Sequence, residues 1–286
     1  MAEEINIQVY MEGLSRVDRV VDDSGFAFTA LDVIIRACSQ QEKGLVSLEP
    51  IKSYLHLLYV NVSKNQIVDA LPLSELQYLV CVDLSDNALT ALPALPQLYL
   101  QSLDISGNQL ATLEGLESGS LTVLKLNGNV LTGLAGLQHL PSLTTLEASR
   151  NAIEDVSSLA SDAAPKLETL HLDDNKLTTM SGIESLSALT SLSLQQNYTD
   201  QRSLRLMQIE SLEAVQQLEQ LSKLTTLDLI GNPVTQAKEY RASIILLAPT
   251  LTHLDGELLT DEDRLAAVEL KHRREAEAAE QAEGNE

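Results

Sequence analysis

Residue types that carry catalysis are thinly spread along this chain. Its five histidines are scattered, and its two cysteines, Cys38 and Cys81, form no metal or redox spacing. No P-loop, G-x-S-x-G turn, H-E-x-x-H helix or C-x-x-C pair occurs. The adjacent carboxylates of Asp173 and Asp174 fall where we expect a strand to turn, and we interpret them as solvated. We therefore predict no catalytic residues, no metal ligands and no cofactor, so that the protein is not an enzyme.

Asparagine, in contrast, recurs at a nearly constant interval. The pattern around it is L-x-x-L-x-L-x-x-N-x-L, as in Leu121, Leu124, Leu126, Asn129 and Leu131. Successive asparagines are 22, 21, 21, 22, 24, 22 and 35 residues apart. Spacing of this regularity indicates one structural unit repeated along the chain. The eight asparagines are Asn65, Asn87, Asn108, Asn129, Asn151, Asn175, Asn197 and Asn232.

The physics of this pattern predicts an α/β leucine-rich-repeat solenoid. The alternating L-x-L is a short strand with one buried face, and stacked repeats bring these strands into a parallel sheet on the concave face of a right-handed arc. The asparagine amide satisfies backbone groups where the chain leaves the strand, so the asparagines form a structural ladder. After each asparagine the apolar spacing becomes three, as in Leu134, Leu137, Leu140 and Leu143, which suits 3₁₀ turns on the convex side.

The pattern also divides the chain into segments. We expect an N-terminal extension over 1–24, a helical cap over 25–56, repeats over 57–234, a C-terminal cap over 235–259 and an acidic helix and tail over 260–286. In the first cap, Thr29 to Asp32 is similar to a capping box, which would place Leu31, Ile34, Ile35 and Cys38 on one helical face. The second cap resembles the motif that closes many intracellular leucine-rich-repeat domains. Its matching residues are Tyr240, Arg241, Asp255 and Gly256.

Two irregular segments leave alternatives open. The 35-residue interval contains about 13 residues more than a normal repeat. Its extra stretch, from Asp200 to Gln217, fits a longer convex helix or a protruding loop, either as a structural insertion or as a partner contact. After it, Thr260 is suited to begin a helix whose first turn is acidic. That helix either ends as a solvated tail or docks on a neighbouring protein.

Net charge restricts the partners. Nineteen Lys and Arg against forty-one Asp and Glu give −22. This field repels the phosphate backbone and anionic lipid, so we expect no binding to nucleic acid or membrane, and a basic protein surface is the natural complement. The N-terminal residues lack the basic and apolar regions of a signal peptide, and no cysteine-stapled cap is present. These features favour an intracellular location.

The concave face is the predicted binding surface. Between the apolar strand residues, the exposed column is acidic at four of eight positions, beside a column of mostly small residues such as Ser102 and Ser191. With no Trp in the chain and one tyrosine in these columns, aromatic anchors are few. The candidate partner-binding residues are Tyr59, Asp83, Asp104, Lys125, Glu147, His171 and Asp228.

The two ends of the solenoid resemble those of one ciliary family, whereas the repeats themselves are generic and only the entry segment points to that family. The entry segment from Ile51 to Val60 is similar to that of the leucine-rich-repeat protein of the ciliary radial spoke. The exit, from Leu227-Asp228-Leu229-Ile230-Gly231-Asn232-Pro233 to Leu254-Asp255, and the helix from Asp261 fit as well. The long seventh repeat and short tail depart from that pattern.

This resemblance implies a non-enzymatic structural scaffold in the axoneme of motile cilia or flagella, part of the cytoskeleton. Its partners would be radial-spoke subunits with basic surfaces. Tubulin is itself acidic, so we expect no direct binding to the microtubule lattice. Other 22-residue-repeat proteins offer alternatives: a phosphatase regulatory subunit, a dynein light chain and a spliceosomal protein.

Overall fold

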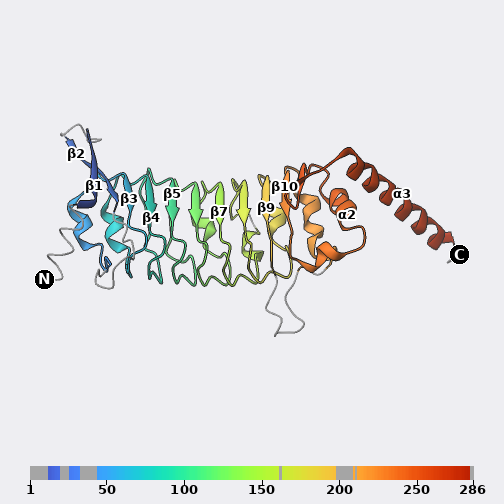
Figure 1. Ribbon diagram of the computed structural model, residues 1–286, viewed down its shortest axis with the longest axis horizontal. Coiled ribbons are helices and arrows are strands. Elements are labelled where there is room, and N and C mark those ends of the chain that lie inside the picture. Colours follow the sequence, from blue (N-terminus) through green and yellow to red (C-terminus); the bar gives the residue numbers. More distant parts are fainter. Residues whose placement is uncertain are drawn as a thin grey trace.

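The computed structural model describes residues 12–19, 26–32, 44–160, 163–197, 209 and 211–283. The molecule is an elongated stack in which successive strands lie side by side along the long axis (Figure 1). The described strands form one sheet in sequence order, from β1 to β12. The chain therefore advances by one turn per repeat, and each repeat contacts chiefly its two neighbours.

The repeat strands are parallel and three residues long. The middle residue of each strand is buried, and the residues before and after it are partly or fully exposed on the other face of the sheet. They are β3 (Tyr59–Asn61), β4 (Cys81–Asp83), β5 (Ser102–Asp104), β6 (Val123–Lys125), β7 (Thr145–Glu147), β8 (Thr169–His171), β9 (Ser191–Ser193) and β10 (Thr226–Asp228). This register confirms the predicted leucine-rich-repeat solenoid with its parallel sheet.

The core runs through the stack without interruption. In one typical repeat, Leu121, Leu124, Leu126 and Leu131 are each fully buried. Burying one leucine contributes about 2 kcal/mol, so the leucines of neighbouring repeats together supply the stability that a single repeat lacks.

Short 3₁₀ helices occupy the far side of the solenoid, where apolar spacing of three predicts them. Leu137, in η3, and Ile183, in η5, anchor theirs in the core. These helices are η1 (Glu49–Ser53), η2 (Leu71–Glu75), η3 (Leu137–His139), η4 (Ser157–Leu159), η5 (Ile183–Ser185), η6 (Glu213–Gln220) and η7 (Pro233–Gln236).

Each asparagine of the ladder joins two repeats. The amide nitrogen of Asn129 donates to the carbonyls of Leu126 in its own repeat and Ile105 in the preceding one, both at 3.0 Å. Its amide oxygen accepts the backbone N–H of Leu110, also at 3.0 Å. The asparagine is 6% exposed, and without it the N–H of Leu110 would be buried without a partner. The carbonyls of Leu126 and Ile105 also accept bonds from Asn151 and Asn108, so each carbonyl is shared by two rungs of the ladder.

The residue before each asparagine adopts the left-handed backbone conformation that turns the chain out of the strand. These residues, with φ between 51° and 79°, are Lys64, Asp86, Gly107, Gly128, Arg150, Asp174, Gln196 and Gly231. Glycine reaches this region freely, whereas the other residue types carry a cost of about 1 kcal/mol. The repeat therefore imposes the same turn even where no glycine is available.

The N-terminal end differs from the expected helical cap. The strands β1 (Leu14–Arg19) and β2 (Phe26–Asp32) form an antiparallel hairpin, and β2 continues the parallel sheet onto β3. The expectation of a helix from Thr29 to Asp32 is wrong, because aromatic and β-branched residues favour a strand here and this strand pairs with β1 on one side and β3 on the other. The predicted boundary between 1–24 and 25–56 separates β1 from β2, although these two strands pair with each other. Ile34, Ile35 and Cys38 lie outside the described residues.

The C-terminal end is closed by α2 (Tyr240–Leu247), β11 (His253–Leu254), β12 (Glu257–Leu258) and α3 (Asp261–Glu283). Tyr240 is 8% exposed. Arg241 contacts Asp263 at 2.7 Å and Glu257 at 3.0 Å, which ties α2 to α3 and β12. Thr260 and Asp263 exchange hydrogen bonds as a capping box at the start of α3.

The two irregular segments lie in and after the seventh repeat. Most of the extra stretch of the seventh repeat, including Leu204 and Met207, lies outside the described residues, but its end forms the 3₁₀ helix η6, in which Val215 is buried. In α3, Ala267 and Leu270 are buried, whereas 271–280 are exposed, and the helix leads away from the solenoid (Figure 1).

Candidate functional site

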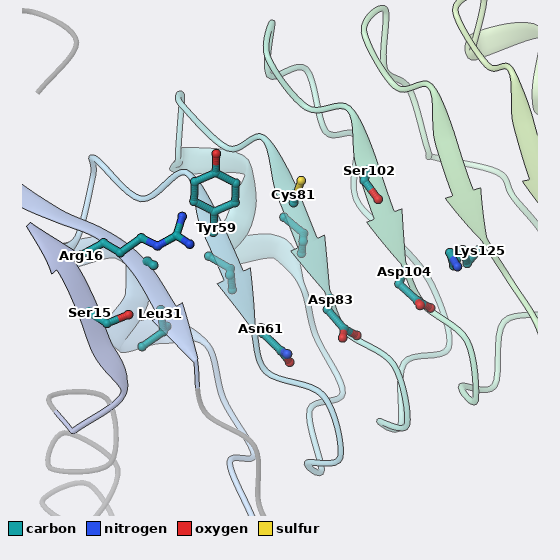
Figure 2. A pocket seen from close by; sticks show the side chains of 13 residues that line it. Ser15, Arg16, Leu31, Tyr59, Asn61, Cys81, Asp83, Ser102, Asp104 and Lys125 are labelled. Atoms are coloured by element: carbon teal, nitrogen blue, oxygen red, sulfur yellow. The ribbon is translucent and has the colours of Figure 1, made fainter. Parts of the chain in front are cut away.

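The exposed face of the sheet carries two columns of side chains, one from each end of the strands. Figure 2 shows Tyr59, Cys81 and Ser102 in one column, with Asp83 and Asp104 in the other. Strand register fixes both columns, since Tyr59 pairs with Cys81 and Cys81 with Ser102. The sheet therefore presents polar groups at intervals of about 4.8 Å along the solenoid.

A shallow hollow lies at the N-terminal end of this face. It is lined by four of the predicted residues, Tyr59, Asp83, Asp104 and Lys125. The remaining predicted residues do not line it: Glu147, His171 and Asp228 lie on strands β7, β8 and β10. The structure thus gathers part of the predicted surface and distributes the rest along the sheet.

Arg16 closes the hollow at its N-terminal end. Its guanidinium carbon lies 5.2 Å from the centre of the Tyr59 ring, which is a cation–π contact. Arg16 has φ of 51° within strand β1, an uncommon backbone conformation for a non-glycine residue. The contact therefore places a cation beside the one exposed aromatic ring of the two columns.

The aspartates of the outer column also have a structural role. The backbone N–H of Ser85 donates to Asp83 Oδ1 at 2.9 Å, and that of Ser106 donates to Asp104 Oδ1 at 3.0 Å. Asn61 accepts the corresponding bond from Ser63 in the first repeat. One oxygen of each side chain thus supports the turn after the strand.

The charges of the two aspartates are nevertheless available to a partner. Within the described residues, neither Asp83 nor Asp104 has an ion-pair partner, although both face the hollow. Lys125, beside them, pairs with Glu147 at 3.1 Å, and Glu147 also accepts a bond from Asn127. The first half of the face therefore offers anionic oxygens, and the Lys125–Glu147 pair marks its end.

The acids of the second half are engaged within the protein. Asp173 accepts hydrogen bonds from Ser193 Oγ at 2.5 Å and from the backbone N–H of Gln195 at 2.7 Å, so our interpretation of it as simply solvated was incomplete. Asp228 accepts a bond from Gln195 Nε2 at 2.6 Å. His171, aligned with Glu147 across the sheet, lies between the two halves.

Nothing in this arrangement resembles a catalytic centre. Burial raises the pKa of the Cys81 thiol, which keeps it protonated as a neutral part of the floor. Within the described residues, no group of three or more His, Cys, Asp or Glu side chains could hold a metal ion. The same part of the chain contains no helix with the length and apolar character needed to cross a bilayer. The face suits contact with an extended or helical segment that brings basic side chains.

Sequence reasoning missed Ser15 and Arg16, which line the hollow from strand β1. They precede the first repeat, so the repeat pattern does not reach them. The aromatic and β-branched residues Phe26, Phe28 and Thr29 could have indicated a strand there, and with it a partner strand upstream.

No protein-family model matches this chain, and a sequence search of the curated proteins finds no match. Solved structures do match. An internalin (inlF) from Listeria monocytogenes is 22% identical, with a TM-score of 0.60 over 81% of this chain and 62% of the internalin. Internalin C2 (inlC2) from the same organism is 21% identical, with a TM-score of 0.53 over 71% of this chain and 82% of its own.

This chain therefore spans less than two thirds of the length of the internalin inlF. At these identities the likeness concerns the fold alone. Together with the register of the sheet, it identifies the chain as a leucine-rich-repeat solenoid.

Proposed function

We propose that this protein is a non-enzymatic scaffold that binds other proteins through the face of its sheet. The observation that carries this proposal is the half-buried pair Asp83 and Asp104, which line a hollow over a floor of small residues and have no ion-pair partner among the described residues. A basic segment would supply the missing cations, and the net charge of −22 would steer it toward the molecule.

We further propose that the scaffold belongs to the axoneme of a motile cilium or flagellum, as a radial-spoke component. The resemblance at the entry and exit segments supports this. These segments contain η1 and β3, which begin the repeats after the β1–β2 hairpin, and Tyr240, Arg241 and Asp255 of the C-terminal cap. Its partners are then axonemal proteins with basic surfaces rather than nucleic acid, membrane or the microtubule lattice.

Location in a ciliated cell tests the ciliary proposal. A tagged full-length protein should remain with the axoneme after detergent removes the membrane, and cross-linking followed by mass spectrometry should join it to radial-spoke proteins. Retention in the cell body would contradict the ciliary proposal. Co-purification with a phosphatase catalytic subunit, without axonemal proteins, would favour the regulatory-subunit alternative.

A further inference from the structure

A second surface lies on the edge of the solenoid, in the loops that lead into β3, β4 and β5. Five side chains form it: Leu55, His56, Tyr78, Leu98 and Tyr99. Leu55 is 52% exposed, Leu98 80% and Tyr99 50%. The rings of His56 and Tyr78 stack, with centroids 5.8 Å apart and planes 11° from parallel. We name these five residues the aromatic edge; it is distinct from the sheet face.

The repeat itself does not require aromatic residues here. The position held by His56, Tyr78 and Tyr99 in the first three repeats is held by small or basic residues in the others: Ser120, Ser142, Lys166, Ala188 and Lys223. Ser120 Oγ donates to the carbonyls of Gln97 and Leu100, and Ser142 Oγ to that of Gly119. Ser120 and Ser142 thus support the backbone, whereas in the first three repeats the same position carries an aromatic ring at the surface.

The aromatic edge also differs in charge from the rest of this acidic molecule. The segments 54–58, 76–80 and 97–101 contain no Asp, Glu, Lys or Arg. Acids nevertheless lie beyond it in both directions. On the convex side, Glu49 and Glu75 share the single cation of Lys52. On the sheet face, Asp83 and Asp104 lie at the far ends of β4 and β5, past Cys81 and Ser102, and are unpaired within the described residues. An apolar centre with acidic borders is complementary to an apolar stripe with basic flanks.

The spacing of the edge suits a helix. Neighbouring strands, and so neighbouring edge loops, are about 4.8 Å apart. One turn of an α-helix rises about 5.4 Å, and residues three and four apart share a face. A helix lying along the solenoid axis can therefore place one aliphatic side chain against each of the three loops, over about two turns.

We propose that the aromatic edge docks a basic amphipathic helix of a partner protein. Aliphatic side chains at every third or fourth position contact Leu55, Leu98 and Tyr99, and flanking Lys or Arg side chains face the acidic borders. Tyr59, the exposed ring of β3, lies three residues after His56. One partner can thus use both surfaces, although this proposal concerns the edge alone and does not depend on the ciliary assignment.

A helical peptide probe tests this proposal on the full-length protein. The probe is a stapled peptide with leucines at i, i+3 or i+4, and i+7, lysines on both flanks, and one tryptophan, because the chain has no Trp of its own. Fluorescence anisotropy should detect binding. The double variant Leu98→Ser/Tyr99→Ser should weaken it about tenfold or more. At position 99 this change introduces the residue found at the equivalent positions Ser120 and Ser142.

Matched controls separate docking from general charge or stickiness. Val68→Ser/Val130→Ser removes two exposed valines outside the aromatic edge, which are 57% and 52% exposed, and should leave the affinity for the peptide unchanged. A peptide of the same composition with its leucines scrambled should bind at least about tenfold more weakly. Equal binding of both peptides, or an equal loss in both double variants, would overturn the proposal. So would a dimer of the wild-type chain in sedimentation that Leu98→Ser/Tyr99→Ser abolishes, because the occupant would then be a second copy.

Discussion

Asp83 accepts a 2.9 Å hydrogen bond from the backbone N–H of Ser85 while its charge stays without an ion-pair partner among the described residues. The same carboxylate thus supports the turn and faces the hollow. Asn61 accepts the equivalent bond in the first repeat, which shows that a neutral amide can support the turn. Structural and binding roles of this column can therefore be separated by replacing Asp with Asn.

The first prediction concerns this separation. Asp83→Asn/Asp104→Asn should keep the turn bonds, because an amide oxygen can accept them as Asn61 does, but should remove the charge. We expect thermal stability close to that of wild type and a loss of affinity of about fivefold or more for an oligolysine peptide. Isothermal titration calorimetry at low and moderate salt measures the affinity.

The control for this prediction removes the same charge elsewhere. Glu114 and Glu117 are exposed acids outside the sheet face, and Glu114→Gln/Glu117→Gln changes the net charge equally. If the two double variants lose affinity to the same extent, only the overall field matters and the hollow is not the binding site. Charge reversal to Lys is a poorer test, because it removes the turn acceptor together with the charge.

The second prediction concerns the ladder. Asn129→Ala leaves the N–H of Leu110 without its partner in the buried stack, while the carbonyls of Ile105 and Leu126 each keep one donor, from Asn108 and Asn151. An unpaired buried group costs about 1–3 kcal/mol, so we expect a loss of about that size in the free energy of unfolding. Urea denaturation followed by circular dichroism measures it. Asn127→Ala, at a half-buried position that bonds Glu147 and Ser149, should cost less.

Sequence reasoning works well where the repeat dictates structure. The positions of Leu124, Leu126 and Asn129 follow from period and burial alone, because each repeat must bury the same face against its neighbours. It fails at Thr29, where the pattern of a capping box competes with the strand propensity of the aromatic and β-branched residues around it. There the open end of the sheet decides in favour of the strand, since β2 extends it from β3.

The candidate site likewise has some features that the sequence predicts and others that it does not. Register follows from the repeat, so the alignment of Asp83 with Asp104 could be predicted. Arg16 could not, because its place over Tyr59 depends on a hairpin that precedes the repeats and on a left-handed backbone conformation. The engagement of Asp173 by Ser193 likewise depends on side-chain geometry between repeats that spacing does not specify.

The third prediction compares two glycines with left-handed backbones. A Cβ at Gly182 would lie 2.4 Å from the carbonyl oxygen of Val156, whereas at Gly128 the nearest atom would be 3.7 Å away. Gly128→Ala should therefore cost about 1–2 kcal/mol from backbone strain alone. Gly182→Ala should cost about 1–3 kcal/mol more, because the neighbouring repeat must shift. Equal losses in urea denaturation would contradict the close approach at Gly182.

The last prediction concerns pH and two aspartates of the C-terminal cap. Burial raises the pKa of Asp255, whose Oδ1 accepts the N–H of Leu229, whereas the hydrogen bond from Arg241 lowers the pKa of Asp263. A carboxyl with a lowered folded pKa stabilises the fold above its unfolded pKa of about 4, and this contribution is lost as pH falls through the folded value.

For Asp255 the sign is opposite. A raised folded pKa means that its contribution is fully present below about pH 4 and is lost as pH rises through the raised value. Asp255→Asn should therefore stabilise the cap at pH 7 relative to its effect at pH 3, since an amide can still accept the bond from Leu229. Asp263→Asn should destabilise it at pH 7 and matter less at pH 3. Urea denaturation of both variants at the two pH values measures this, and the same pH trend in both would refute the opposite electrostatic roles of the two carboxyls.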